Sequence, residues 1–196
     1  MRLFAAVLPP APAAAELASY ADRLRELPGA DELRWTAREG WHFTLAFLAE
    51  VAEETLPEVS QRMERAARRT PAFPLSLHGG GRFGERALWA GAAGDVAALR
   101  LLAARADAAA RKAGVPMEEH RAYRPHLTLA RARGGDVDLR PYVAALGSFA
   151  GTPWTVADLA LVRSNLPHSG VAGERPRYEV VGRWGLGAPR AAFPGG

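Results

Sequence analysis

Two short segments, one in each half of the chain, carry the same residue types in the same order. His42-Phe43-Thr44-Leu45-Ala46 and His126-Leu127-Thr128-Leu129-Ala130 both read histidine, apolar residue, threonine, leucine, alanine. In a β-strand, residues i and i+2 point to the same face. The spacing therefore predicts that the histidine and the threonine of each segment share one face, while the apolar residues anchor the other face in a core.

These residue types suit phosphoryl chemistry if the two segments face each other across a groove. An unperturbed histidine titrates near pH 6.5, so one imidazole can donate a proton while another accepts one. Threonine hydroxyls can donate to phosphate oxygens as negative charge builds up in the transition state. A single histidine beside apolar residues is more often structural, but a duplicated motif favours a site. The pattern predicts His42 and His126 as an acid/base pair, with Thr44 and Thr128 as phosphate donors and no metal ion.

The double His-x-Thr-x pattern resembles the two-histidine phosphoesterase superfamily, specifically the RNA 2',3'-cyclic phosphodiesterases once called 2'-5' RNA ligases. The resemblance extends over nearly the whole chain. Besides the two motifs in Trp41–Leu48 and Tyr123–Arg131, it rests on Arg2–Val7, Gly81–Gly84 followed by Leu88–Gly91, Leu161–Ser164 and Arg177–Val180.

The resemblance implies an α+β, bilobal fold: two lobes of antiparallel sheet, related by a pseudo-two-fold axis, around a central groove with helices outside. It also implies metal-independent hydrolysis of RNA 2',3'-cyclic phosphate termini to 2'-phosphate, without a cofactor. By position, His42 is the proton donor to the leaving 3' oxygen, His126 accepts the proton of water, and Thr44 and Thr128 bind the phosphate. Arg131 is implied as a substrate-binding residue. Ideal strand alternation points it away from Thr128, so this role requires a bulge or a strand end.

Other functions remain open for the same residues. The motifs are compatible with a 2'-5' RNA ligase, or with a phosphodiesterase for 2'-5' oligonucleotides or a cyclic ADP-ribose phosphate. A catalytically silent RNA-binding module is a further alternative, although the intact histidines and threonines favour an enzyme. The expected partners are RNA ends or small cyclic nucleotides, and the chain is expected to be a monomer without an obligate protein partner.

The composition excludes several classes of protein. The chain has no cysteine, so disulfides and thiolate metal sites are ruled out. No apolar run approaches the roughly 20 residues that span a bilayer. The apolar start is broken by Pro9 and Pro10, which favours a first strand over a signal peptide. We therefore expect a cytoplasmic protein with a single two-lobed domain over residues 1–186 and a frayed tail over residues 187–196.

Other signals have simpler interpretations. The glycines of Gly79–Gly84 fit G-x-G-x-x-G, but a strand rather than a helix is expected next, which indicates a turn. His78, His120 and His168 have no partner at metal-ligand spacing. The net charge is modest, at +4. A helix bearing Arg62, Arg65, Arg68 and Arg69 is expected to present a solvated face, with an RNA contact as the alternative.

Hydrophobic periodicity and turn residues predict the elements that position the two motifs. Strands are expected at Arg2–Leu8, Leu33–Thr36, His42–Leu48, Phe73–His78, Ala87–Gly91, His126–Ala132, Trp154–Val162 and Tyr178–Trp184. Helices are expected at Pro12–Leu27, Glu53–Arg69, from the cap at Asp95 through Lys112, and at Asp138–Leu146. Because helices alternate with strands, a parallel α/β sheet is the alternative fold. The loop over residues 167–174 is expected to be long and to influence substrate access.

Overall fold

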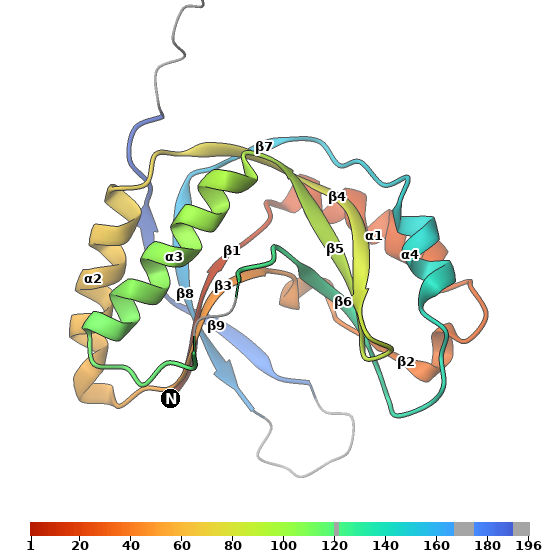
Figure 1. The fold of residues 1–196 in the computed structure, drawn as a ribbon, viewed down its shortest axis with the longest axis horizontal. Coiled ribbons are helices and arrows are strands. Elements are labelled where there is room, and N and C mark those ends of the chain that lie inside the picture. Colours follow the sequence, from red (N-terminus) through yellow and green to blue (C-terminus); the bar gives the residue numbers. More distant parts are fainter. Residues whose placement is uncertain (120–121, 167–174, 190–196) are drawn as a thin grey trace, which may run out of the picture.

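A computed structural model describes residues 1–119, 122–166 and 175–189, and in this part of the chain two antiparallel sheets carry four α-helices on their outer faces (Figure 1). The strands are β1 (Arg2–Val7), β2 (Leu33–Trp35), β3 (Phe43–Glu50), β4 (Phe73–Phe83), β5 (Ala87–Gly94), β6 (Leu127–Ala132), β7 (Trp154–Val156), β8 (Asp158–Asn165) and β9 (Arg177–Gly185). The helices are α1 (Ala11–Leu24), α2 (Leu56–Arg68), α3 (Val96–Lys112) and α4 (Arg140–Leu146). Short 3-10 turns occupy Ala30–Glu32, Arg38–Gly40 and Glu53–Thr55. The predicted bilobal α+β fold is confirmed.

The first lobe is built on a four-stranded sheet in the order β3-β1-β8-β9. Helices α2 and α3 lie side by side on its outer face, with α3 against β3 and α2 against β9 (Figure 1). Asp95 caps α3 as predicted, because its carboxylate accepts a hydrogen bond from the Ala98 amide at 2.9 Å. The buried face of α3 carries Leu99, Leu102 and Ala106, each fully buried.

The second lobe is built on a five-stranded sheet in the order β2-β6-β5-β4-β7. Helices α1 and α4 pack on β4. They are joined at the Tyr20 hydroxyl, which donates to the Ala145 carbonyl at 2.7 Å. Each strand pairing in the two sheets is antiparallel across the described residues, so the parallel alternative is wrong.

The two lobes are interleaved along the sequence. Strand β6, from the second half of the chain, lies between β2 and β5 from the first half. In the other sheet, β8 and β9 continue the order from β1. Neither lobe is therefore formed by one half of the chain.

Both His-Thr segments contain a bulge at the same position of the motif. On β3, Ala46 pairs with Ala5 and Thr44 with Ala6, which leaves Leu45 without an opposite residue. On β6, Ala130 pairs with Leu88 and Thr128 with Trp89, which leaves Leu129 without one. An extra residue at such a point turns the side chains of the following residues to the other face of the sheet.

Two predicted boundaries are wrong for physical reasons. Strand β4 continues through the glycine-rich run that was expected to be a turn. It bulges there, with Gly79 at φ +58°, and Gly80–Phe83 pair with β5. The single strand expected at Trp154–Val162 is two strands: β7 pairs with β4, and after Ala157 the chain crosses to the other sheet, where β8 pairs with β1. The apolar pattern runs across this crossing without interruption.

The other boundaries shift by a few residues. Helix α1 ends three residues early, since the amides of Glu26 and Leu27 donate to carbonyls three residues back and not four. Helix α2 is preceded by a 3-10 turn over Glu53–Thr55, and α4 begins two residues later than expected.

The last strand ends at Gly185, one residue beyond the predicted end at Trp184, and backbone contacts continue after it. The Leu186 amide donates to the Ala157 carbonyl at 2.8 Å, and Gly187 pairs with Pro71. Gly187 belongs to the segment expected to be a frayed tail. Residues 190–196 of that tail, and the loop over residues 167–174, lie outside the described residues. No helix in the described part of the chain is both long and apolar enough to span a membrane.

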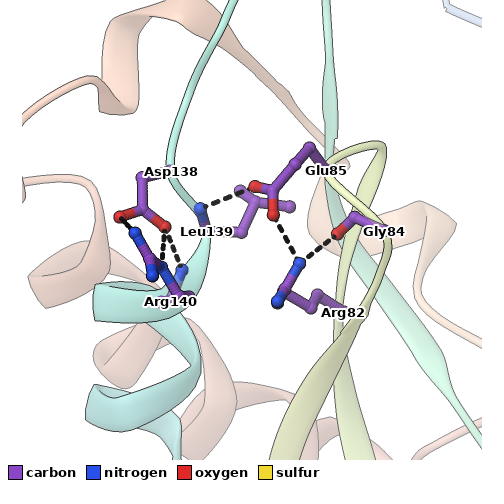
Figure 2. Close-up of polar contacts among 6 residues, drawn as sticks. All are labelled: Arg82, Gly84, Glu85, Asp138, Leu139 and Arg140. Atoms are coloured by element: carbon purple, nitrogen blue, oxygen red, sulfur yellow. Dashed lines mark hydrogen bonds and ion pairs between the residues drawn. The ribbon is translucent and has the colours of Figure 1, made fainter.

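The tip of the β4–β5 hairpin is tied to the start of α4 (Figure 2). The Glu85 carboxylate accepts a hydrogen bond from the Leu139 amide at 3.2 Å and forms an ion pair with Arg82. Next to it, Asp138 accepts hydrogen bonds from the Arg140 amide and guanidinium. Carboxylates are favoured at a helix N-terminus, and the contact of Glu85 with Leu139 joins the hairpin tip to the helix.

Candidate functional site

His42 and His126 occupy equivalent places, each directly before the first residue of its strand. The Nδ1 atom of His42 lies 2.7 Å from the Gly40 carbonyl oxygen, and Nδ1 of His126 lies 2.7 Å from the Arg124 carbonyl oxygen. A carbonyl can only accept, so each hydrogen bond requires a proton on Nδ1. Each imidazole therefore has Nε2 as its free nitrogen. As predicted, the intervening Phe43 and Leu127 are fully buried.

The two motifs meet at a small cavity of about 150 Å³, which we call the histidine pocket. Its lining residues are Thr36, Gly40, His42, Thr44, His126, Thr128, Arg131 and Tyr178. The structure thus brings together all five residues predicted from the sequence, from strands in two different sheets. Their chemical roles remain predictions.

The bulge at Leu129 explains why Arg131 reaches the pocket. Opposite residues in an antiparallel pair share a face. Thr128 is opposite Trp89 and Arg131 is opposite Ala87, and Trp89 and Ala87 are two residues apart on β5. Arg131 therefore points to the same side as Thr128, although an unbroken strand would have turned it away. This is the bulge that the predicted role of Arg131 requires.

His42 is enclosed by aromatic rings. Phe4 stacks on the imidazole with ring centroids 4.5 Å apart, and Tyr178 meets it edge-on at 5.4 Å. Burial lowers the pKa of His42 to about 4. The hydrogen bond to Gly40 opposes this shift, and the nearby His126 adds to it. In the free protein, His42 is consequently neutral at pH 7.

His126 lies in a second aromatic setting on the opposite lobe. The Phe83 ring meets it edge-on at 4.8 Å, and Trp89 lies at 6.2 Å. Phe83 belongs to the hairpin tip that Glu85 ties to α4 (Figure 2). The close passage of Trp89 over β4 depends on Gly81, because a Cβ there would overlap the indole.

Two larger cavities adjoin the histidine pocket. One, of about 500 Å³, shares Thr36, Gly40, Arg131 and Tyr178 with the pocket and adds Arg34 and Arg177. The other, of about 820 Å³, shares Thr44 and His126 and adds Arg100, Arg124 and Tyr123. We call them the arginine cavity and the α3 cavity. A ligand centred on the histidine pocket can extend in either direction.

Sequence reasoning missed three residues that shape the pocket: Thr36, Gly40 and Tyr178. Gly40 supplies the carbonyl that holds His42. It also lies so close to Tyr178 that a Cβ would meet the Tyr178 ring at 3.2 Å. Tyr178 is on β9, far from both motifs in sequence. No local pattern marks these contacts, since only the pairing of β8 with β9 brings Tyr178 to the site.

The remaining histidines do not join the pocket. His78 is exposed on β4, where it forms a bridge to Ala150. His120 and His168 lie outside the described residues. Within the described ranges, no three side chains of His, Cys, Asp or Glu are grouped so that they could hold a metal ion.

A two-lobed fold with paired His-x-Thr motifs at one pocket defines a class of phosphoesterase, and comparison with known proteins gives the family. The model of the LigT-like phosphoesterase family matches residues 7–89 and 93–172. This chain therefore belongs to the LigT-like phosphoesterase family.

Several relatives carry the name RNA 2',3'-cyclic phosphodiesterase. The relative from Thermus thermophilus is 31% identical over 100% of this chain and 97% of its own length. That from Escherichia coli is 30% identical over 78% of this chain and 80% of its own. The relative from Geobacillus stearothermophilus is 31% identical over 79% of this chain, but the match spans only 48% of that protein.

Solved structures share the fold. Apo LigT from E. coli has a TM-score of 0.73 and 27% identity, over 95% of this chain and 97% of its own. TT0787 from T. thermophilus has a TM-score of 0.74 and 30% identity, over 96% and 99%. E. coli LigT complexed with 3'-AMP has a TM-score of 0.71 and 26% identity, over 94% and 96%.

Proposed function

We propose that this protein hydrolyses 2',3'-cyclic phosphate ends of RNA to 2'-phosphates, without a metal ion, using His42 and His126 as its acid/base pair. The observation that carries the proposal is the matched orientation of the two imidazoles. Each is held through Nδ1 by a backbone carbonyl, which leaves Nε2 as its free nitrogen at a pocket lined also by Thr44 and Thr128. The names of the relatives support the same substrate class.

The reaction needs one proton removed and one supplied. Water attacks phosphorus as its proton passes to Nε2 of His126, and the bond from phosphorus to the 3' oxygen breaks. Nε2–H of His42 donates its proton to that oxygen, so the product is a 3'-hydroxyl and a 2'-phosphate. The two histidines end with exchanged protonation states and return to the start by proton exchange with solvent. Thr44, Thr128 and Arg131 stabilise charge on the non-bridging oxygens.

The low pKa of His42 is compatible with its donor role once substrate is bound. A phosphodiester anion about 4 Å away interacts with a positive imidazole by about 4 kcal/mol at an effective dielectric constant of about 20. One pKa unit corresponds to about 1.36 kcal/mol, so the anion raises the pKa by about 3 units. Starting from about 4 in the free protein, the pKa of His42 then lies close to neutrality.

A direct test uses a short oligoribonucleotide with a 2',3'-cyclic phosphate end, in the presence of excess EDTA. We expect conversion to a 2'-phosphate terminus, identified by its resistance to an enzyme that removes only 3'-phosphates. Loss of turnover on chelation and recovery with one divalent ion would contradict the metal-independent mechanism. Turnover of 2'-5' dinucleotides or of a cyclic ADP-ribose phosphate, with no turnover of cyclic-ended RNA, would replace the proposed substrate.

A further inference from the structure

A second feature suited to phosphate lies outside the histidine pocket, between α2 and α3. A groove of about 710 Å³ is lined by Arg62, Arg65, Arg68, Arg69, Arg105 and Lys112, and we call it the basic groove. Its other lining residues are Ala104, Ala108 and Ala109. Among the described residues that line it, none is acidic. Figure 1 shows α2 and α3 side by side on the outside of the first lobe.

The cations of this groove are only partly neutralised. Arg62 pairs with Glu58 and Arg68 pairs with Glu64, each one helical turn away. Arg105 donates to the Arg69 carbonyl and to Thr70 Oγ1, so it is fixed in place but keeps its charge.

Three further cations in the groove remain available to a ligand. Arg65, Arg69 and Lys112 are exposed, and their side chains make no ion pair or hydrogen bond with the described residues. The planar guanidinium groups of Arg65 and Arg69 can each bind two phosphate oxygens at once.

The basic groove adjoins the α3 cavity. Ala104 lines both, and the α3 cavity reaches Thr44 and His126 in the histidine pocket. Along α3, Arg100 faces the α3 cavity and Lys112 faces the basic groove. At about 1.5 Å per residue, their separation along the helix is about 18 Å.

We propose that the basic groove binds the phosphate backbone of the RNA whose cyclic end lies in the histidine pocket. The inference rests on the proposed function for the source of that RNA, and on charge complementarity for the contact itself. The alanine side chains that line the groove on α3 are small, so phosphates can approach that helix closely. Binding here favours RNA chains over mononucleotides without taking part in the chemistry.

The test compares two triple variants that remove the same charge. The groove variant is Arg65→Gln, Arg69→Gln, Lys112→Gln. The control is Arg23→Gln, Arg25→Gln, Arg133→Gln, on exposed positions of the second lobe. Affinity is measured for a roughly 20-nucleotide RNA with an ordinary 3'-hydroxyl, so that binding does not depend on turnover. Hydrolysis of a 2',3'-cyclic mononucleotide is measured alongside.

We expect the groove variant to bind the RNA at least about tenfold more weakly at low salt, and to reduce the slope of log affinity against log salt by about 2. The control variant keeps the affinity to within about twofold, and both variants keep mononucleotide turnover. Equal RNA affinity in the two variants overturns the proposal, as does a groove that binds anionic phospholipid vesicles and not RNA. Absence of mononucleotide hydrolysis in the unmodified protein counts against the proposed function but leaves the binding result intact.

Discussion

The imidazole of His42 stacks on the ring of Phe4, with centroids 4.5 Å apart and planes inclined by 27°. Phe4 is itself buried in a small cluster with Ala6, Ala160 and Val162 of the four-stranded sheet. One face of the histidine is thus shielded from water by a side chain that cannot stabilise a positive charge through hydrogen bonding. This shielding is part of the burial that lowers the pKa of His42. The same contact therefore affects both the proposed catalysis and the stability of the protein.

The protein should lose stability in acid through His42. Above pH 6.5 the residue is neutral in both folded and unfolded chains. As the pH falls from about 6.5 to about 4, the unfolded chain takes up the proton first, and the free energy of unfolding decreases by about 3 kcal/mol. Thermal unfolding of the wild type and of His42→Gln at pH 7 and pH 4.5 measures this difference. An equal loss of Tm in both proteins would contradict it.

The pH dependence of the rate should differ between kcat/KM and kcat. Turnover needs one histidine protonated and the other neutral, so the acidic limb lies at the lower pKa of the pair, whichever residue is the donor. In kcat/KM, which reports the free enzyme, we expect this limb near pH 4, where His42 titrates. The limb in kcat reports the substrate complex, in which the phosphate anion raises the pKa of His42, so it should lie at higher pH. Both limbs belong to the coupled histidine pair. Coincident acidic limbs would argue against the proposed effect of the substrate.

Replacing either histidine should remove a proton-transfer step. We expect His42→Ala and His126→Ala each to reduce kcat by on the order of 10²–10⁴. The double variant should be little worse than either single one, because the residues act as a unit. Thr44→Ala and Thr128→Ala should cost less, since water partly replaces a hydroxyl donor.

The direction of proton transfer can be tested with a substrate whose leaving 3' oxygen is replaced by sulfur. Sulfur departs with little protonation, so this substrate should restore the rate of His42→Ala and not that of His126→Ala. The reverse pattern would exchange the two roles. Normal turnover of the natural substrate by either single variant would remove that histidine from the mechanism.

Arg131 should contribute to substrate binding because the bulge turns it toward the pocket. Arg131→Gln should raise KM for a cyclic mononucleotide by about tenfold, the effect of losing a charge-assisted hydrogen bond of roughly 1.5 kcal/mol. Arg34→Gln is the matched control. Arg34 is opposite Arg131 in the β2–β6 pair and lines the arginine cavity, but not the histidine pocket. Equal effects of the two substitutions would show that only general positive charge matters.

Glu85 should stabilise the hairpin tip that carries Phe83 (Figure 2). Glu85→Ala removes the acceptor of the Leu139 amide and the partner of Arg82, at a cost of about 1–2 kcal/mol. Thermal unfolding measures the loss, with Glu26→Ala as an exposed control on the same lobe. A Tm equal to that of the control would mean that the tip is held by its packing alone.

The sequence alone predicts the elements and the facing of the two motifs, because strand alternation is a local property. Thr44 and Thr128 accordingly lie on the side opposite the buried Leu45 and Leu129. The position of a residue within a sheet depends on which strands pair, so it is not a local property of the sequence. The bulge that redirects Arg131 depends on the register with β5, and the contact of Tyr178 with His42 depends on the pairing of β9 with β8.

The crossing between sheets could not be predicted for a related reason. The segment from Trp154 to Val162 has one continuous β pattern, and only its partners distinguish β7 from β8. A similar limit applies to Gly79–Gly84. Glycine is common in turns, yet here the run allows β4 to bulge and lets Trp89 pack across it.

The interleaving of the two lobes has a consequence for how the enzyme assembles. Because β6 is inserted between β2 and β5, the second histidine has no fixed place until strands from both halves of the chain have paired. Such non-local pairing gives a high contact order and slow folding. We therefore expect each half of the chain, expressed separately, to expose unpaired strand edges and to lack activity, whereas the two fragments mixed together can complement each other. Recovery of turnover during refolding consequently follows completion of the whole molecule and not the formation of a single lobe.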